Sequence, residues 1–370
     1  MPFEIDFLPV GNGDRSGDAI ALRYGEPGAY TIIVYDGGTK DSGAKLVEHI
    51  KKYYGTDYVD HVVNSHPDGD HASGLSEVLE KLQVGTLWLH RPWNYSKVIL
   101  DYFKDGRITS ESLKQRLQEK MASAYQLEQI ALKNGIEIRE PFQGASIGAF
   151  YVLSPEKDWY LHDLIADFSK SPDQKKSEAA AFQQSTYGLL RALSEAAKKA
   201  ATWIADKWEI ELLREDVKTS AENESSVVMY GYMQDHKHGI LLTGDAGVNA
   251  LGRAVDYLDI NNVSAPQSIN FVQVPHHGSR HNVSTSVLDR ILGKRLPSKP
   301  AKYEKFSFVS AGKESTTHPR QMVVNAFLRR GVRVDATKGT SKRHQRGMPS
   351  REGWEASTPL EFAERVESWD

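Results

Sequence analysis

Four potential metal ligands fall within six residues in the segment His66-Pro67-Asp68-Gly69-Asp70-His71. Hard divalent cations prefer oxygen ligands and borderline cations also accept imidazole, so a mixed set of His and Asp suits Zn, Mn or Fe. The apolar segment Val59 to Val63 precedes these ligands, and Pro67 and Gly69 allow a tight turn between them. A solvated surface turn rich in Asp and His would have the same composition, so this segment alone does not establish a metal site.

Two later segments also place His or Asp directly after an apolar strand pattern. In Ile240-Leu241-Leu242-Thr243-Gly244-Asp245 the glycine allows a close approach of the backbone, and the carboxylate follows it. In Phe271-Val272-Gln273-Val274-Pro275-His276-His277-Gly278-Ser279 two histidines follow the strand. Taken alone, Asp245 could be a turn former or a helix N-cap, and the histidines could be a surface pair. Together, the three strand ends predict one shared rim of ligands.

The elements that must position these residues alternate along the first part of the chain. Strand patterns, with period-two alternation or β-branched residues, occur at Phe3 to Phe7, Ala19 to Tyr24, Thr31 to Tyr35, Val59 to Val63 and Thr86 to His90. Helical spacing occurs at Lys45 to Tyr53 and at Gly74 to Leu82. This alternation favours an α/β layer architecture.

The middle of the chain is mostly helical in pattern, and strand patterns resume after it. The helical stretches run from about Asn94 to Gly135 and from Lys157 to Val217. Strand patterns occur at Ile136 to Arg139, Phe150 to Leu153, Val227 to Tyr232, Gly239 to Thr243, Phe271 to Val274, Phe306 to Val309 and Val332 to Ala336. Two β-rich halves therefore flank a helical block.

The composition limits the chemistry and the partners. There is no cysteine, so disulfides, zinc fingers and a cysteine nucleophile are excluded, and His, Asp, Glu or backbone oxygen must bind any metal. A net charge of -3 excludes a uniformly basic surface but leaves a local basic groove open. We find no signal-peptide pattern and no apolar run near the roughly 20 residues that span a bilayer. A soluble, cytoplasmic protein without membrane association is expected.

The combined motifs resemble those of the metallo-β-lactamase superfamily and, within it, the branch of the DNA-uptake protein ComEC. The features that carry the resemblance are His66-x-Asp68-x-Asp70-His71, Thr243-Gly244-Asp245 and Pro275-His276-His277-Gly278-Ser279. Weaker similarities are Val10-Gly11-Asn12-Gly13-Asp14, Asp18-Ala19-Ile20, Val34-Tyr35-Asp36-Gly37-Gly38, Asn223-Glu224-Ser225-Ser226 and His318-Pro319. The resemblance covers about residues 3–90 and 223–340.

This resemblance implies an αββα sandwich with two divalent metal ions, Zn or Mn, at one edge. It assigns His66 and Asp68 to the first metal and Asp70 and His71 to the second. Asp245 would bridge the metals, and one or both of His276 and His277 would complete the set. Many members of the superfamily have His at the position of Asp68 and a further His ligand in the middle of the chain. The ComEC branch has the Asp and lacks that His, as here, which makes Mn an alternative to Zn.

The chemistry that follows from such a site is hydrolysis. A bound metal lowers the pKa of water, and two metals about 3.5–4 Å apart can hold the attacking and leaving oxygens of a phosphodiester. The residues expected to act in catalysis are Asp70, Asp245, His276 and His277. One of the two histidines could instead be a general acid toward the leaving group. The expected substrate-binding residues, for which turn capping or loop stiffening is the alternative, are Asn223, Ser226, Ser279 and His318.

The resulting prediction is a hydrolase domain over residues 1–340, with a helical insertion at about 157–220 and a polar C-terminal extension over 341–370. The expected function, by analogy with the ComEC branch, is a metal-dependent phosphodiesterase or nuclease acting on DNA or RNA. It could be an effector controlled by a partner protein that docks on the insertion. One alternative is a hydrolase of a small phosphodiester or a lactone, and a closed apolar pocket would favour it over a long basic groove. Another is a regulatory or inactive interaction module.

Overall fold

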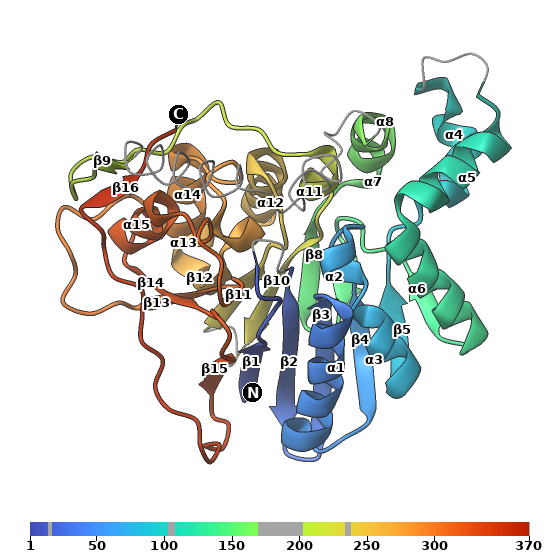
Figure 1. Ribbon diagram of the computed structural model, residues 1–370, viewed down its shortest axis with the longest axis horizontal. Helices are drawn as coiled ribbons and strands as arrows, with labels where there is room; N and C mark the ends of the chain where they lie inside the picture. The colour runs from blue at the N-terminus through green and yellow to red at the C-terminus, as the bar shows by residue number, and fades with distance from the viewer. Residues whose placement is uncertain (14–16, 103–107, 169–202, 234–237, 370) are drawn as a thin grey trace, which may run out of the picture.

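Two seven-stranded sheets lie face to face at the centre of the molecule (Figure 1). The computed structural model describes residues 1–13, 17–102, 108–168, 203–233 and 238–369. The first sheet has the order β15-β1-β2-β3-β4-β5-β6 and the second has the order β14-β13-β12-β11-β10-β8-β7. The strands of the first sheet are β1 (Phe3–Phe7), β2 (Ala19–Glu26), β3 (Ala29–Gly37), β4 (Tyr58–Val63), β5 (Gln83–Trp88), β6 (Glu137–Arg139) and β15 (Lys342–Arg346). Those of the second are β7 (Ser146–Ile147), β8 (Phe150–Ser154), β10 (Val228–Met233), β11 (His238–Leu242), β12 (Ile269–Gln273), β13 (Lys305–Val309) and β14 (Val332–Ala336).

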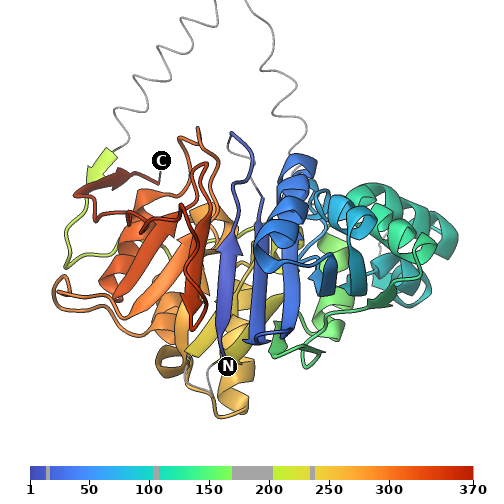
Figure 2. The same ribbon diagram turned by 90° about the horizontal axis from the view of Figure 1, so that it is seen from below.

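Helices cover the outer face of each sheet, so the layers run helix, sheet, sheet, helix (Figure 2). On the side of the first sheet lie α1 (Lys40–His49), η1 (Ile50–Tyr54), α2 (Gly69–Ala72), α3 (Leu75–Lys81), η2 (Pro92–Tyr95), α4 (Ser96–Ile99), η3 (Leu100–Tyr102), α5 (Ser110–Lys120) and α6 (Ala122–Lys133). The later helices are α7 (Lys157–Trp159), η4 (Tyr160–Leu164), α8 (Ile165–Asp167), α11 (Ala221–Glu224), α12 (Val248–Ile260), α13 (Ala265–Ser268), η5 (Pro275–Gly278), α14 (Thr285–Leu292) and α15 (Gln321–Arg329).

Three hydrophobic cores fill the spaces between these layers. The core between the sheets includes Phe3, Ile5 and Phe7 of β1, which alternate along the strand and pack with Phe271 and Phe308 of the other sheet. A second core joins the first sheet to α1, α3 and α6, and a third joins the second sheet to α12, α14 and α15. The predicted αββα sandwich is therefore confirmed, because each sheet buries apolar residues on both of its faces.

The chain after residue 157 differs from the predicted helical insertion. Residues 157–168 are helical, residues 169–202 lie outside the described residues, and residues 203–220 hold the strand β9 (Trp203–Ala205) and no helix. β9 pairs antiparallel with β16 (Arg365–Glu367). The chain is extended there because its hydrogen-bonding partner is a strand more than 150 residues later. Asp206 then forms a buried ion pair with Arg329 of α15, which fixes the segment against the second half of the molecule.

The predicted polar C-terminal extension contributes a strand to the sandwich. β15 pairs antiparallel with β1 and forms the edge of the first sheet. The alternation of β1 turns Glu4 and Asp6 to the outer face, where both are fully buried. Arg351 donates to Asp6 Oδ2 at 2.8 Å and lies 2.9 Å from Glu4 Oε2, and Arg343 also pairs with Glu4. The sequence pattern does not reveal this role, because the arginines of the extension find their carboxylates on a strand some 340 residues earlier in the chain.

Among the described residues, no helix is long and apolar enough to cross a membrane.

The ion pairs of β1 lead to a stability prediction. Replacing Arg351, which is nearly buried, by Met leaves Asp6 without its guanidinium, so the free energy of unfolding should fall by about 3 kcal/mol at neutral pH. The matched control is Arg346→Met at the end of β15, which is exposed and should change the free energy by less than about 0.5 kcal/mol. Urea unfolding measures both; equal effects of the two variants would contradict the assignment.

The same ion pair should depend on pH in a defined direction. Burial raises the pKa of the Asp6 carboxyl, but His49 and Arg351 outweigh it and hold this pKa below the usual 3.8. Because the folded pKa is depressed, the contribution of Asp6 is complete above about pH 4 and disappears as the pH falls through the folded pKa. The difference in unfolding free energy between wild type and Arg351→Met should therefore shrink in acid.

Candidate metal centre

The predicted ligands all follow strands whose carboxyl ends meet at one edge of the sandwich. β4 ends shortly before His66, and the turn after it leads into α2, which carries Asp70 and His71. β11 ends shortly before Asp245, and β12 ends before η5, which carries the two adjacent histidines. β3 runs parallel to β4, and β11 runs parallel to β12, so the ends of each pair lie at the same edge of their sheet.

One carboxylate oxygen stands at the centre of four imidazole rings. Asp245 Oδ2 lies 3.4 Å from the Nε2 atom of His71 and 3.7 Å from that of His276. The Nε2 atoms of His66 and His277 each lie 3.8 Å from the same oxygen. All four histidines present the same ring nitrogen to this point. The three segments that the sequence predicts to share a rim therefore do converge.

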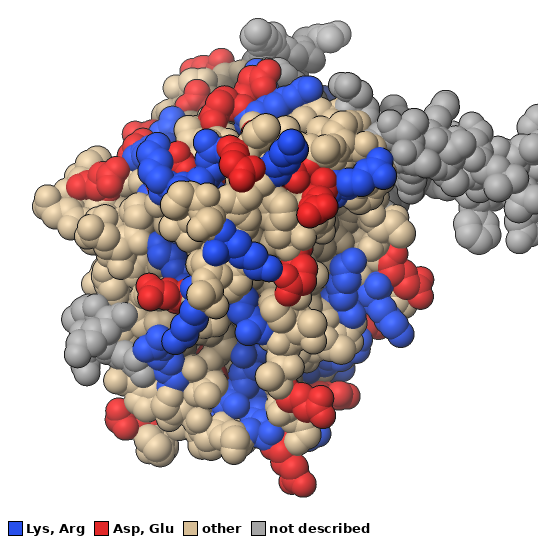
Figure 3. All heavy atoms as spheres, turned by 90° about the vertical axis from the view of Figure 1, so that its left-hand side faces the viewer, with Lys and Arg blue, Asp and Glu red and all other residues tan. Residues whose placement is uncertain are grey.

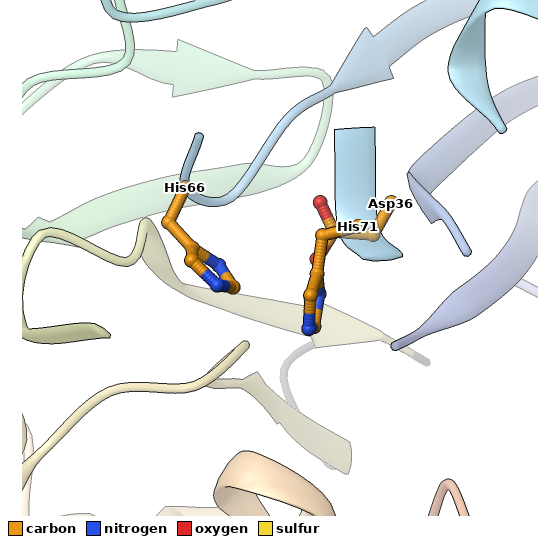
Figure 4. A group of neighbouring side chains, drawn as sticks. All are labelled: Asp36, His66 and His71. Atoms are coloured by element: carbon orange, nitrogen blue, oxygen red, sulfur yellow. The ribbon is translucent and has the colours of Figure 1, made fainter. Parts of the chain in front are cut away.

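Several buried polar atoms of this cluster lack a partner. His66 Nε2, His71 Nε2 and Asp245 Oδ1 are buried and form no hydrogen bond. In Figure 4 the rings of His66 and His71 point to the same side, and Asp36 stands behind His71. A buried polar atom without a partner costs about 1–3 kcal/mol, and a cation bound among these atoms would remove that cost. The residues therefore fit a divalent metal centre.

The nitrogen and oxygen atoms of this cluster form three overlapping groups that are compact enough to surround a metal ion. The atoms within each group lie within 4.8 Å of one another; the groups are Asp36, His66 and His71, then Asp70, His71 and His277, then Asp18, Asp245 and His277. His71 and His277 each belong to two groups, so neighbouring positions share ligands. This overlap suits a centre with more than one ion.

Asp36 holds the first two histidines in place. His71 Nδ1 lies 2.8 Å from Asp36 Oδ2, and the hydroxyl of Ser65 donates to the same carboxylate and lies 2.9 Å from His66 Nδ1. When Nδ1 of His71 donates to Asp36, its Nε2 carries the free lone pair that a metal needs. In the sequence, Asp36 is recognisable only as the residue at a strand end before Gly37 and Gly38. Nothing in the sequence indicates its left-handed backbone conformation (φ 58°).

The two adjacent histidines reach the centre through an unusual backbone. His276 has φ 45° and His277 has φ 55°, and both lie in the left-handed region that side chains rarely adopt. Each such residue costs on the order of 1–3 kcal/mol and is typical of functional sites. His276 Nδ1 lies 2.9 Å from Asn282 Oδ1 and 2.9 Å from the side-chain nitrogen Nδ2 of Asn223. His277 Nδ1 lies 3.2 Å from the backbone carbonyl oxygen of Ser310.

The electrostatics of the cluster favour a cation at its centre. Burial lowers the pKa of His66 and of His277 to about 4, so both rings are neutral, as metal ligands must be. Burial also opposes protonation of His71, but Asp245 and Asp36 outweigh it and raise its pKa well above the ordinary value. Burial would raise the pKa of Asp245, yet the surrounding histidines, His71 foremost, hold it well below its usual range. The negative charge here calls for a positive partner.

The other predicted residues lie at the rim or behind the ligands. Asp68, whose side chain is 36% exposed, lies 3.8 Å from His66 Nε2. Ser226 is fully buried and accepts a hydrogen bond from the Asp245 amide, which favours its capping alternative over phosphate binding. Ser279 faces a cleft, and the ring of His318 stacks on that of His276 with centroids 6.3 Å apart.

An open cleft of about 760 Å³ lies beside the ligand cluster. Its polar lining includes Asn223, His276 and Ser279. The charged lining residues among those described are Asp163, Asp167, Glu224 and Lys218. Judged by the described residues that line it, the cleft is neither a closed apolar cavity nor a basic groove.

A second groove of about 1010 Å³ lies along the edge strand β15 and is lined by Arg333, Lys342, Arg343 and Arg351. Figure 3, a view of the left-hand side of Figure 1, has Lys and Arg side chains down the middle of the surface, with Asp and Glu among them toward the top. Arg343 and Arg351 are paired with buried carboxylates of β1, so their charges are largely compensated and less available to an anionic ligand.

Comparison with known proteins supports the resemblance seen in the motifs. Residues 16–127 match the family model of the metallo-beta-lactamase superfamily, a stretch that contains the His66 to His71 cluster but ends before Asp245. No curated protein matches the chain. The predicted superfamily is thus supported for this part of the chain, and the ComEC branch stays a prediction.

Several solved structures align with most of the chain at low identity. The metallo-beta-lactamase fold protein YhfI from Bacillus subtilis is 9% identical, with 93% of this chain and 100% of that one covered and a TM-score of 0.41. A diphosphatase from the PhnP family is 9% identical, with 93% and 99% covered and a TM-score of 0.37. A long form RNase Z from yeast is 10% identical, with 83% and 36% covered and a TM-score of 0.32.

The geometry of the centre predicts which change removes the metal. The variant Asp245→Ala deletes the oxygen on which the four rings converge, so its metal content should fall from about two ions per chain to less than one. The control is His61→Gln, which removes a histidine of β4 that contacts Trp88 rather than the cluster and should keep the wild-type content. Elemental analysis of purified protein measures both. Wild-type content in Asp245→Ala would place the metal elsewhere.

Proposed function

We propose that this protein is a metal-dependent phosphodiesterase that cleaves DNA or RNA. The observation that carries the proposal is the convergence of four imidazole Nε2 atoms on the buried carboxylate oxygen of Asp245. In this proposal His66 and Asp68 hold a first ion, Asp70 and His71 hold a second, and Asp245 lies between them. Zn and Mn both suit these ligands.

When bound, the metal pair would activate water and neutralise charge on the phosphate. The chain's own residues have the remaining tasks. Asp36 orients His71, and the amide of Asp245 donates to Ser226, so the ligand side chains are held before substrate arrives. Because the left-handed turn at His276 and His277 fixes the direction of both rings, little reorganisation is needed during the reaction.

His276 differs from the other three histidines in a way that suits proton transfer. Its side chain is 24% exposed and lines the cleft, whereas His66, His71 and His277 are buried. Its Nδ1 atom lies 2.9 Å from Asn282 Oδ1, and its Nε2 atom lies 3.7 Å from Asp245 Oδ2, at the side of the cluster where the ring lines the cleft. We therefore assign His277 as a ligand and His276 as the group that donates a proton, from Nε2, to the leaving oxygen.

The nucleic-acid substrate is proposed from the resemblance to the ComEC branch, and the lining of the cleft does not favour it over the alternative of a small phosphodiester. The cleft beside His276 has three carboxylates and one lysine among its described charged residues, which is not the lining of a long basic groove. Of these carboxylates, Glu224 is occupied, because it accepts a hydrogen bond from the Ala250 amide. A lactone is a third substrate class. Control by a partner on residues 157–220 and a cytoplasmic location stay predictions.

A substrate panel tests the reaction class. Purified protein with Mn, Mg or Zn should cleave single-stranded or double-stranded DNA, or RNA, and also bis(p-nitrophenyl) phosphate, and Asp245→Ala should reduce each rate to background. Cleavage confined to a choline-type phosphodiester or a lactone would support the small-molecule alternative instead. A metal-loaded protein that cleaves no phosphodiester would end the phosphodiesterase proposal and leave the metal centre standing.

The role of His276 can be separated from that of a ligand by the choice of leaving group. Ribose and deoxyribose alkoxides need a proton as they leave, whereas p-nitrophenolate does not. His276→Ala should therefore lose roughly 10²–10⁴-fold in rate on nucleic acid and far less on bis(p-nitrophenyl) phosphate, with unchanged metal content. Equal losses on both substrates together with lost metal would make His276 a ligand.

A further inference from the structure

The buried amide of Gln273 has a defined orientation. Its Oε1 accepts hydrogen bonds from the backbone N–H groups of Thr243, at 2.9 Å, and of Gly244, at 3.1 Å. Two donors on one atom identify that atom as the oxygen, so the Nε2 group must point the other way. There it donates to Asp18 Oδ2 at 2.8 Å. Asp18 therefore acts as the acceptor of the amide.

This contact joins three strand ends across the sandwich. Asp18 immediately precedes β2 of the first sheet, Gln273 is the last residue of β12 in the second, and Thr243 and Gly244 follow β11. The side chains of Asp18 and Gln273 are separated by 255 residues in sequence and are almost fully buried, at 2% and 0% exposure. Because water has little access to either group, the loss of one partner would leave the other unsatisfied.

The two ends of this connection lie at the metal centre. Gly244 precedes Asp245, and its φ of +51° is the bend that turns the next residue toward the four histidines. At the other end, Asp18 Oδ2 lies 3.9 Å from His71 Nδ1, and its carboxylate belongs to one ligand-sized group with Asp245 and His277.

The position of Asp18 is also fixed by the residue before it. Gly17 has φ +59°, and a Cβ atom there would lie 1.5 Å from the carbonyl oxygen of Asp70. The loop that carries Asp18 therefore packs directly on the backbone of the turn that carries Asp70. Asp18 is thus held against the turn that carries Asp70 and is connected, through Gln273, to the loop that carries Asp245.

We infer that Asp18 and Gln273 form a relay of hydrogen bonds that positions Asp245 between the two halves of the metal centre. Asp18 is a positioning residue in this account and not a ligand. Asp18 orients the side-chain amide of Gln273, and this amide holds the backbone of Thr243 and Gly244. That backbone in turn directs the Asp245 carboxylate toward the histidines. The inference rests on the proposed metal centre but is independent of the substrate.

A swapped pair of side chains tests the relay. Gln273→Glu places a carboxylate 2.8 Å from that of Asp18, and this repulsion should weaken metal binding roughly 10- to 100-fold. In the double variant Asp18→Asn with Gln273→Glu, the asparagine amide donates to one glutamate oxygen, and the other oxygen still accepts from Thr243 and Gly244. The hydrogen bonds and the total charge are restored, so the double variant should bind metal within about threefold of wild type.

The readouts are metal titration and the thermal unfolding of the metal-free proteins. The control, Asn270→Asp at the other end of β12, keeps an acceptor for the Gly239 amide and should leave metal binding unchanged. If the double variant binds metal no better than Gln273→Glu, the relay is wrong, since a directly ligating Asp18 would be lost in the double variant. A stable wild type that binds no metal would instead refute the metal centre itself, and that result is distinguishable from the first.

Discussion

The structure depends on one buried carboxylate, Asp245, whose Oδ2 atom is surrounded by four imidazole nitrogens at 3.4 to 3.8 Å. In this arrangement the facing nitrogens of His66 and His71 and the second oxygen of Asp245 are buried without a hydrogen-bond partner. A divalent cation satisfies both kinds of ligand at once. The sandwich provides this arrangement by bringing the carboxyl ends of strands from both sheets to one edge. The strand order that forms the fold therefore also brings the ligands together.

Much of the architecture follows from local patterns in the sequence. The alternation of β1 and the β-branched runs of β4 and β12 are readable because burial on one or two faces fixes which residues are apolar. The cluster from His66 to His71 is visible because its ligands are contiguous. The three strand ends predict one rim that also holds Asp245 and His277, and the resemblance gives these residues their roles; the structure brings them together.

The features that the sequence did not reveal depend on contacts between distant residues or on backbone conformation. The left-handed backbone of His276 and His277 has no compositional signal, since neither residue is a glycine. The acidic face of β1 looks solvent-exposed until arginines from β15 and the segment after it cover it. β9 is likewise extended only because β16 pairs with it. For both β1 and β9 the deciding partner lies more than 150 residues away.

Anomalous diffraction from crystals grown with Mn or Zn would locate the ions without reference to activity. We expect two peaks about 3.5–4 Å apart with the Asp245 carboxylate between them, and histidine Nε2 atoms at about 2.0–2.2 Å from the ions. Peaks elsewhere in the molecule, or none within bonding distance of Asp245, would contradict this expectation.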